Sequence, residues 1–348
     1  MKHRMFLFAL LLCVAGALVV ESTVAQNKRT GTAAATELLI PVGARDLAMG
    51  GSTIATSSGI DAIYWNPAGL GRMKASAEGM FSNMTYIADI GVSYGAVGAS
   101  FGEFGVLALS VKSLDFGDIP LTTEDDPENI SERYFSPTFV TIGLSYSRAV
   151  TDAISFGGTL KLISEQIAQV SASGFAIDLG VQYNRVAGIG GLSLGVAVKN
   201  VGPQMKFDGS GLYRSATSVD GRRPQQRYRG EAASSELPSL IEIGLSYGGM
   251  SSENLSYSVN GSFMNNNLYL DQYNLGGEVG YSMNEFKFFG RAGVGLVPSA
   301  EEKENIFGAT FGAGFNYATT GVDITIDYAY RAVEFFDANN VFSVKFGF

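Results

Sequence analysis

The sequence FAIDLGVQY at residues 175–183 shows the pattern that decides the fold of this chain of 348 residues. Phe175, Ile177 and Leu179 are apolar, and the residues between them are small or polar. Successive residues of a β-strand point to opposite faces, so this spacing predicts a strand with one apolar and one polar face. The same alternation recurs as far as VFSVKFGF at 341–348. We therefore expect an all-β protein.

The lengths of the connections distinguish a membrane barrel from a soluble β-sandwich, which shows the same alternation. We can place about fourteen runs, an even number, and most are long enough to cross a bilayer as tilted strands. The two longest connections, 117–135 and 203–238, fall on one side, whereas Thr151-Asp152 on the other side is a very short turn. Long outer loops and short periplasmic turns are typical of outer-membrane barrels.

Aromatic residues end the strands that are predicted to run towards the periplasm, as in the interface girdle of such barrels. All except Phe101 fall on the outward phase, and we expect a β-bulge in the strand before Phe101. Residues 75–348 are thus predicted to form a transmembrane antiparallel β-barrel of about 14 strands in the bacterial outer membrane. The girdle residues are Phe101, Tyr146, Tyr183, Tyr247, Tyr281, Tyr317 and Phe348.

Residues 1–25 have the organisation of a cleaved secretory signal peptide. A basic start is followed by an apolar run at 5–20, which is shorter than a membrane-spanning helix of about 20 residues. Small residues then precede Gln26, where we expect cleavage. His3 and Cys13, the one His and the one Cys of the chain, both lie in this segment.

The mature chain would therefore lack the groups for Ser-His-Asp or Cys-His catalysis and for the usual zinc sites. Asp323 and Asp327 share a face of one predicted strand but would lie about 13 Å apart, too far for a catalytic pair. We predict no enzymatic activity, no metal site and no cofactor. A net charge of −9 and the exported location also argue against a nucleic-acid partner.

Residues 26–74 do not alternate, and we predict that they form a plug inside the barrel. A cylinder of about fourteen strands is too wide to be filled by its own side chains, so its lumen needs a filler. Glycines at inward positions would leave room for that filler. These glycines are Gly143, Gly157, Gly180, Gly195, Gly244, Gly312 and Gly347.

The predicted plug contains GARDLAMGGSTIA at 43–55 and DAIYWNPAGL at 61–70. Asn66-Pro67 predicts a rigid turn in which Asn66 caps backbone groups, and the neighbouring aromatic residues are expected to be packing anchors. The two charged residues of the first sequence pair either with the barrel wall or within the plug. The structural or gating motif comprises Arg45, Asp46, Tyr64, Trp65, Asn66, Pro67 and Gly69.

These two sequences resemble the N-terminal signature of the PorV/PorQ family of outer-membrane proteins, relatives of the FadL-like channels. The resemblance is most specific over 43–70 and extends loosely over the barrel. It implies a fourteen-stranded barrel with an N-terminal hatch. It also implies one of two functions: a partner of the type IX secretion translocon or of its secreted cargo proteins, or a FadL-like channel for hydrophobic small molecules.

The two long outer loops have opposite charges: 117–135 is acidic and 203–238 is basic. They are either solvated loops that attract each other across the barrel mouth, or binding surfaces. In the second interpretation, arginines grip lipopolysaccharide phosphates or an acidic partner segment, because the guanidinium group binds such anions through two hydrogen bonds. The candidate partner contacts are Arg222, Arg223, Arg227 and Arg229.

Overall fold

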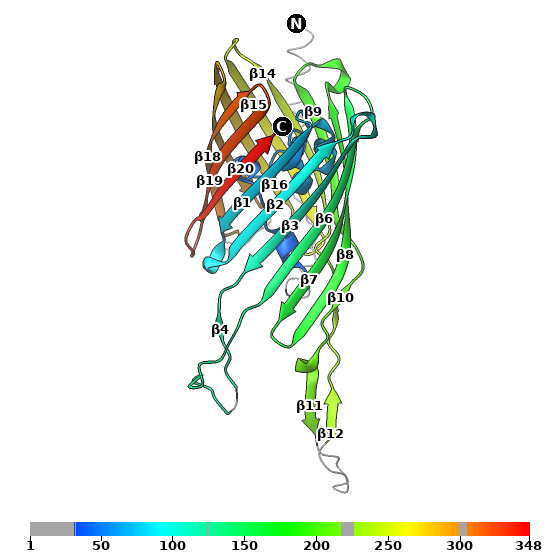
Figure 1. The fold of residues 1–348 in the computed structure, drawn as a ribbon, viewed down its shortest axis with the longest axis vertical. Coiled ribbons are helices and arrows are strands. Elements are labelled where there is room, and N and C mark those ends of the chain that lie inside the picture. Colours follow the sequence, from blue (N-terminus) through cyan, green and yellow to red (C-terminus); the bar gives the residue numbers. More distant parts are fainter. Residues whose placement is uncertain (1–30, 32, 124, 217–225, 299–304) are drawn as a thin grey trace.

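Fourteen antiparallel strands form a closed barrel in this computed structural model, which describes residues 31, 33–123, 125–216, 226–298 and 305–348 (Figure 1). Strand β20 (Asn339–Gly347) returns to pair with β1 (Ala77–Thr85), so the sheet has no free edge. Closure gives the backbone N–H and C=O groups of the edge strands hydrogen-bond partners, which lipid cannot offer. The predicted fold class is confirmed. The predicted signal peptide, 1–25, lies outside the described residues.

The barrel strands are long enough to cross a bilayer at the usual tilt. Among the described residues, no helix has both the length and the hydropathy of a membrane-spanning helix. The other barrel strands are β2 (Gly91–Ser100), β3 (Val106–Asp115), β6 (Thr138–Ala149), β7 (Ile154–Ile167), β8 (Val170–Asn184), β9 (Leu192–Val201), β14 (Leu240–Met250), β15 (Leu255–Asn266), β16 (Gln272–Met283), β17 (Phe286–Leu296), β18 (Phe307–Thr319) and β19 (Val322–Val333).

Most strands present an apolar face outwards and a polar or small face to the lumen. In β6, for example, Ile142 and Leu144 are exposed on the outside, whereas Ser145 and Ser147 are buried inside. This arrangement follows directly from the alternation in the sequence. It surrounds the barrel with an apolar band that matches the hydrocarbon core of a membrane.

The two longest connections, β3 to β6 and β9 to β14, extend from one end of the barrel, and the short turn between β6 and β7 lies at the other, as predicted (Figure 1). The turn between β7 and β8 is also short but lies at the same end as the two longest connections. We call the end with the two longest connections the outer end. The connection from β3 to β6 contains a small hairpin of β4 (Ile119–Pro120) and β5 (Tyr134–Phe135). The connection from β9 to β14 contains β10 (Met205–Lys206), η7 (Ser210–Leu212), β11 (Tyr213–Ala216), β12 (Gln226–Arg229) and β13 (Ser234–Ser235).

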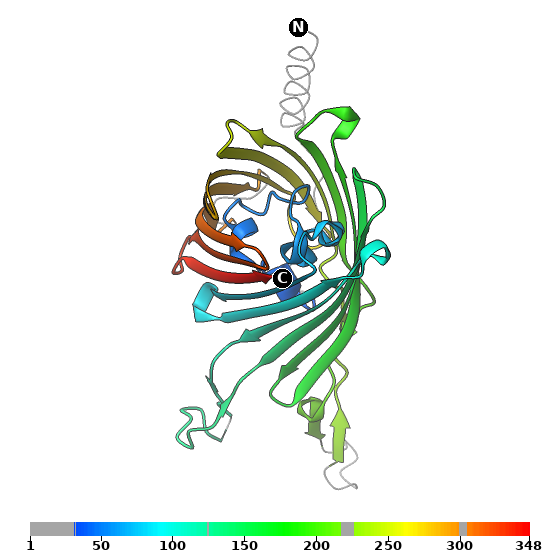
Figure 2. The same ribbon diagram turned by 45° about the horizontal axis from the view of Figure 1, so that its top comes forward.

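A series of short helices before β1 lies inside the barrel (Figure 2). We use the word plug for the described part of this segment, residues 33–74. Plug residues such as Ile60 and Leu70 are fully buried, and they share one apolar core with the inner faces of β1, β2 and β3. The plug helices are η1 (Thr36–Leu39), α2 (Ala44–Leu47), η2 (Gly59–Asp61), α3 (Ala62–Trp65) and η3 (Pro67–Arg72).

Strand β2 reverses the usual arrangement of its two faces, and this corrects one prediction. Its apolar residues Val92 and Tyr94 are buried inside the barrel, because they belong to the core shared with the plug. The odd-numbered positions of β2 therefore point outwards, and Phe101 continues that phase just beyond the end of the strand. The predicted bulge is wrong, since β2 pairs with β3 in unbroken register from Gly91 to Ser100.

Inward glycines allow the plug backbone to touch the wall directly. A Cβ added at Gly195 would lie 2.2 Å from the Ile54 carbonyl oxygen, and one at Gly157 would lie 2.3 Å from the Pro67 carbonyl oxygen. Such distances leave no space for a side chain. Plug atoms also lie within 2.4 Å of an added Cβ at Gly180, Gly244, Gly276, Gly293 and Gly312. Gly143 and Gly347, by contrast, face barrel residues and Ala75.

We expect Gly195→Val to displace the plug, because the valine side chain needs the space that the Ile54 backbone occupies. Gly290→Val is a matched control, since Gly290 is exposed and an added Cβ there has nothing within 4 Å. Limited proteolysis of the folded barrel should cut the plug of the Gly195 variant faster. Equal protection of the plug in both variants would contradict the direct contact.

Candidate functional site

Asn66 is a fully buried polar residue that joins the plug to the barrel wall. Its Nδ2 donates hydrogen bonds to the Ile54 carbonyl in the plug at 2.8 Å and to the Val181 carbonyl in β8 at 3.1 Å. Its Oδ1 accepts one from the Ala68 backbone N–H at 3.1 Å and so caps η3, which begins at Pro67. The predicted capping by Asn66 is confirmed, and the contact with the wall is an additional role.

Tyr64 and Trp65 pack edge to face in the plug, with ring centroids 5.1 Å apart. Trp65 is buried, and its Nε1 donates to the Val42 carbonyl at 3.1 Å. The nearby Gly69 is packed so closely that an added Cβ would lie 2.0 Å from the Ser57 carbonyl oxygen. The motif thus holds the folded plug together by direct contacts, as expected for packing anchors.

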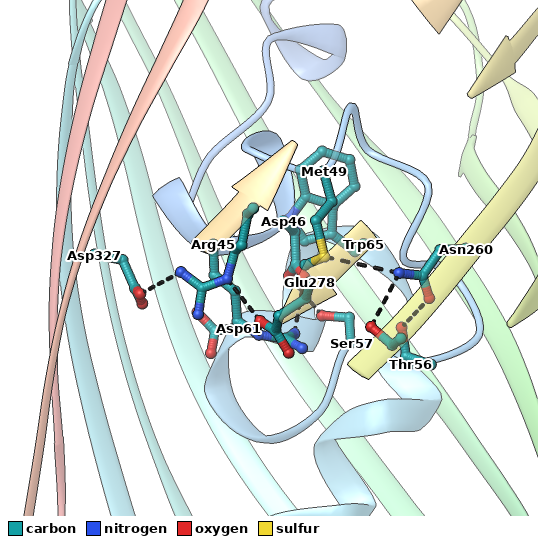
Figure 3. Close-up of polar contacts among 12 residues, drawn as sticks. Arg45, Asp46, Met49, Thr56, Ser57, Asp61, Trp65, Asn260, Glu278 and Asp327 are labelled. Atoms are coloured by element: carbon teal, nitrogen blue, oxygen red, sulfur yellow. Dashed lines mark hydrogen bonds and ion pairs between the residues drawn. The ribbon is translucent and has the colours of Figure 1, made fainter. Parts of the chain in front are cut away.

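Arg45 connects the plug to the wall through one of its two carboxylate contacts (Figure 3). Its Nη1 lies 2.9 Å from Asp46 Oδ1, and its Nε lies 3.5 Å from Glu278 Oε2 in β16. Asp46 also accepts a hydrogen bond from Ser57 Oγ at 2.8 Å. Both arrangements that the sequence left open therefore occur: Arg45 contacts the wall, and Asp46 is held within the plug.

The charged groups of the wall extend this network. Arg291 in β17 lies 2.6 Å from both Glu278 Oε2 and Asp327 Oδ1. Lys345 in β20 lies 2.5 Å from Asp61 Oδ2 in the plug. Alternating charges in a site of reduced polarity hold one another in place. The sequence analysis did not single out Arg291. Its alternating position in the strand at 285–297 would have predicted a side chain that points into the lumen.

A second group of charges lies on the opposite part of the wall. Lys161 is paired with Asp178 at 2.5 Å, and Lys199 with Glu242 at 3.0 Å. The Lys199 Nζ also lies 5.1 Å from the centre of the Tyr64 ring, within the range of a cation–π contact. These inward charges of opposite sign are thus paired across neighbouring strands.

Glu37 in η1 is a buried acid that the sequence did not single out. Burial, together with the nearby carboxylate of Glu165 in β7, raises the pKa of Glu37 to about 8. Glu165 also accepts a hydrogen bond from the Ala35 backbone N–H at 3.1 Å, and Lys112 Nζ donates to the Glu37 carbonyl at 2.6 Å. The start of the plug is therefore held to the wall by polar groups that are far apart in sequence.

A cavity of about 740 Å³ lies between the plug and the outer end of the barrel. Leu47, Tyr64 and Trp65 of the plug form part of its floor, and Phe116 and Phe139 form part of its apolar wall. Its volume falls in the usual range for sites that bind small molecules. Residue spacing in the sequence does not locate such a cavity, because its walls come from many strands and from the plug.

The wall of this cavity is irregular where β17, β18 and β19 meet. Pairing between β17 and β18 ends at Gly293 and Thr310, although β17 continues to Leu296. The register of β18 with β19 shifts between Phe307 and Thr310. Gly295, which also lines the cavity, lies beyond the last of these paired residues. An interrupted ladder of this kind is a local weak point of the sheet.

The basic outer loop forms a two-stranded ribbon in which β11 pairs with β12. Arg227 and Arg229 are exposed on β12, and Arg229 forms an ion pair with Asp208. Arg222 and Arg223 lie outside the described residues. Within the described ranges, no ion pair joins this ribbon to the acidic loop at 117–135. Among these described residues, no direct ion pair therefore supports the expected attraction between the two loops.

A closed barrel with an apolar outer band and a folded segment in its lumen defines a plugged outer-membrane barrel. The family model described as "Type IX secretion system protein PorV" matches residues 23–218. The chain belongs to this family and is an integral protein of the bacterial outer membrane. No curated protein gives a significant match to the chain.

Several solved structures resemble this barrel. The toluene transporter TodX of P. putida has a TM-score of 0.55 and 12% identity, with 88% of this chain and 99% of that chain covered. The CymD monoaromatic hydrocarbon channel has a TM-score of 0.54 and 14% identity, with 89% and 98% covered. The Ralstonia pickettii toluene transporter TbuX has a TM-score of 0.54 and 14% identity, with 88% and 98% covered. At identities this low, the similarity shows a shared fold alone.

We expect Asn66→Ala to loosen the plug. The change removes the Asn66 donor from the Ile54 and Val181 carbonyls, at a cost of about 0.5–1.5 kcal/mol for each hydrogen bond, while the Ile54 carbonyl keeps its bond from Gln182 Nε2 at 3.3 Å. Single-channel conductance in planar bilayers should rise, and Trp65→Ala should act in the same direction by removing packing. Asn83→Ala, at an exposed strand position, is the control. Unchanged conductance in the Asn66 variant would refute the proposed role of the motif.

Plug stability should also depend on pH through Glu37. Its pKa in the folded protein lies above the ordinary 4.5, at about 8, so folding favours the protonated form. The stabilisation is complete below about pH 4.5 and is lost as the pH rises through about 8. Glu37→Gln should flatten this dependence when thermal unfolding is followed between those values, and Glu128→Gln in the outer loop should not. A flat wild-type profile would contradict the assignment.

Proposed function

We propose that this protein is a non-enzymatic partner of the type IX secretion translocon or of the proteins that it exports. The observation that carries the proposal is the family match over 23–218, which includes the plug motif and the strands through β9. The contacts within the lumen support it, because a barrel packed with residues 33–74 offers poor passage to a polypeptide. A role beside the translocon suits such a barrel better than a role as the pore.

The basic ribbon of β11 and β12 is the surface we propose for partner contact. It extends from the outer end of the barrel, and all of its described residues are exposed (Figure 1). Arg227 and Arg229 would bind acidic groups of a protein partner or lipopolysaccharide phosphates. Arg222 and Arg223 belong to the same proposal through their position in the sequence. The apolar outer band would contact membrane lipid.

Affinity purification from outer membranes tests the main proposal. The wild-type protein should co-purify with translocon components or exported cargo, and its deletion should reduce secretion. Arg227→Glu with Arg229→Glu should weaken co-purification, whereas Arg148→Glu with Lys287→Glu changes the same charge at exposed positions near the short turns. A solitary purified barrel, combined with normal secretion in the deletion strain, would count against the proposal.

A second candidate function is the passage of hydrophobic small molecules. The apolar cavity and the irregular wall at β17 and β18 favour it, and the similar structures include proteins described as toluene transporters. A molecule in the cavity would leave sideways through that wall into the membrane. Uptake of a hydrophobic compound such as toluene should then fall on deletion, and unchanged uptake would exclude this function for that compound.

The domain boundaries also remain a proposal. We assign residues 1–25 to a cleaved signal peptide, 26–74 to the plug and 75–348 to the barrel. Mass spectrometry of the N-terminus of the protein from outer membranes tests the first boundary, which predicts a mature chain that starts at Gln26.

A further inference from the structure

A small polar cavity lies where the plug packs against β2, β3, β6 and β7. Its volume of about 30 Å³ has room for a monatomic ion or a water molecule but not for an organic compound. It is distinct from the cavity of about 740 Å³, although the two share part of their lining. The polar side chains that line it are Tyr94, Ser110, Lys112, Thr141, Thr159 and Lys161, all of them buried.

Lys112 in β3 is a buried cation that contacts no carboxylate directly. Its Nζ donates to the Glu37 carbonyl at 2.6 Å and to the Ile40 carbonyl at 2.5 Å, and an ammonium group has a third N–H to give. Among the described residues, no carboxylate oxygen lies within 4.0 Å of this Nζ. Lys161, which lines the same cavity, is by contrast paired with Asp178. Lys112 therefore lacks a counter-charge at contact distance.

The charges further from Lys112 do not supply that counter-charge. Lys161 and Lys199, although each has an acid partner, repel it. The carboxyl of Glu37 acts on it with the opposite sign, but this acid is largely protonated at neutral pH because its pKa is about 8. The Tyr64 ring centre, 5.2 Å from Nζ, contributes a cation–π contact and no negative charge. A buried charge without a counter-charge is unfavourable, so the position favours an anion.

The hydroxyl groups of the cavity are suitable donors to an anion. Thr141 Oγ1 in β6 is buried and has no hydrogen-bond partner among the described residues. The Tyr94 hydroxyl lies beside that of Ser110, and a bond between the two uses one hydrogen and leaves one O–H free to donate. None of the described side chains that line the cavity is a carboxylate or an amide. A water molecule would satisfy Thr141 but would leave the charge of Lys112 uncompensated.

We propose that this cavity binds a single monatomic anion such as chloride, held by the Lys112 ammonium group and the Thr141 hydroxyl. Hydrogen bonds to an ionised partner are the stronger ones, so one small ion satisfies both groups. Leu38 and Ile63 of the plug also line the cavity, and the site is therefore complete only when the plug is seated. The ion thus fastens the plug to the wall. The inference depends neither on the secretion role nor on passage through the wall.

Hydrogen exchange of the wild-type protein tests the proposal in solution. The full protein is purified in a maltoside detergent, and sodium chloride is compared with sodium gluconate at the same pH and ionic strength, because gluconate is too large for the cavity. Exchange of the plug amides should slow about tenfold when chloride reaches ten times its dissociation constant, since the ion binds only the seated plug. Exchange in the loop at 117–135 should not change. Equal exchange of the plug in the two salts would overturn the proposal.

Thr141→Val tests the assigned hydroxyl, because valine keeps the shape of threonine and removes the donor. Loss of a hydrogen bond to an ion should weaken chloride binding about tenfold to a hundredfold, and Lys112→Met should abolish the effect of chloride. Thr138→Val, at an exposed position of the same strand, is the matched control and should respond like wild type. An undiminished response to chloride in a folded Thr141→Val protein would overturn the proposal.

Bromide locates the ion directly and needs no variant. In crystals of the full protein grown with sodium bromide, anomalous scattering should show a peak between Lys112 Nζ and Thr141 Oγ1. A water molecule at that place, without an anomalous peak, would overturn the proposal. None of these measurements bears on co-purification with the translocon or on uptake of hydrophobic compounds.

Discussion

Direct contact between the plug backbone and the inward glycines is the constraint on which the rest of this structure depends. A fourteen-strand cylinder cannot fill itself with its own side chains, and glycine lets a second segment approach the strands without an intervening Cβ. Gly195 and Gly157 illustrate the result, because carbonyl oxygens of the plug occupy the space of the missing side chains. The barrel and the plug therefore fold as one packed unit, even though one is a sheet and the other a chain of short helices.

Polar groups in the lumen add orientation to this packing. Asn66 binds carbonyls of the plug and of β8 with one amide, and Arg45 contacts carboxylates of the plug and of β16 with one guanidinium. Buried charges and amides contribute little net stability when paired, but an unpaired one is costly. These contacts consequently favour one position of the plug relative to the barrel wall over shifted positions.

The sequence was sufficient for the barrel and only partly sufficient for the site. Period-two alternation and connection lengths depend on local geometry, so the strands, their number and the outer end could be predicted. Strand β2 was misjudged because its apolar residues Val92 and Tyr94 face the plug, whereas apolar residues of most strands face lipid. The Asn66 cap is local and was foreseen. Glu37 lies beside Glu165, and Lys199 pairs with Glu242. Each pair joins residues that are distant in sequence, and no short-range pattern encodes such encounters.

The links between the plug and the seam of the barrel have a consequence for assembly. The seam forms where β20 pairs with β1, and Ser343 of β20 accepts a hydrogen bond from the Ala44 backbone N–H at 2.8 Å. Lys345 of the same strand contacts Asp61. These contacts need the plug and the closed seam together, because Ala44 and Asp61 belong to the plug and their partners belong to the last strand. Closure of the sheet and seating of the plug are therefore coupled, and each completes polar contacts that the other leaves open.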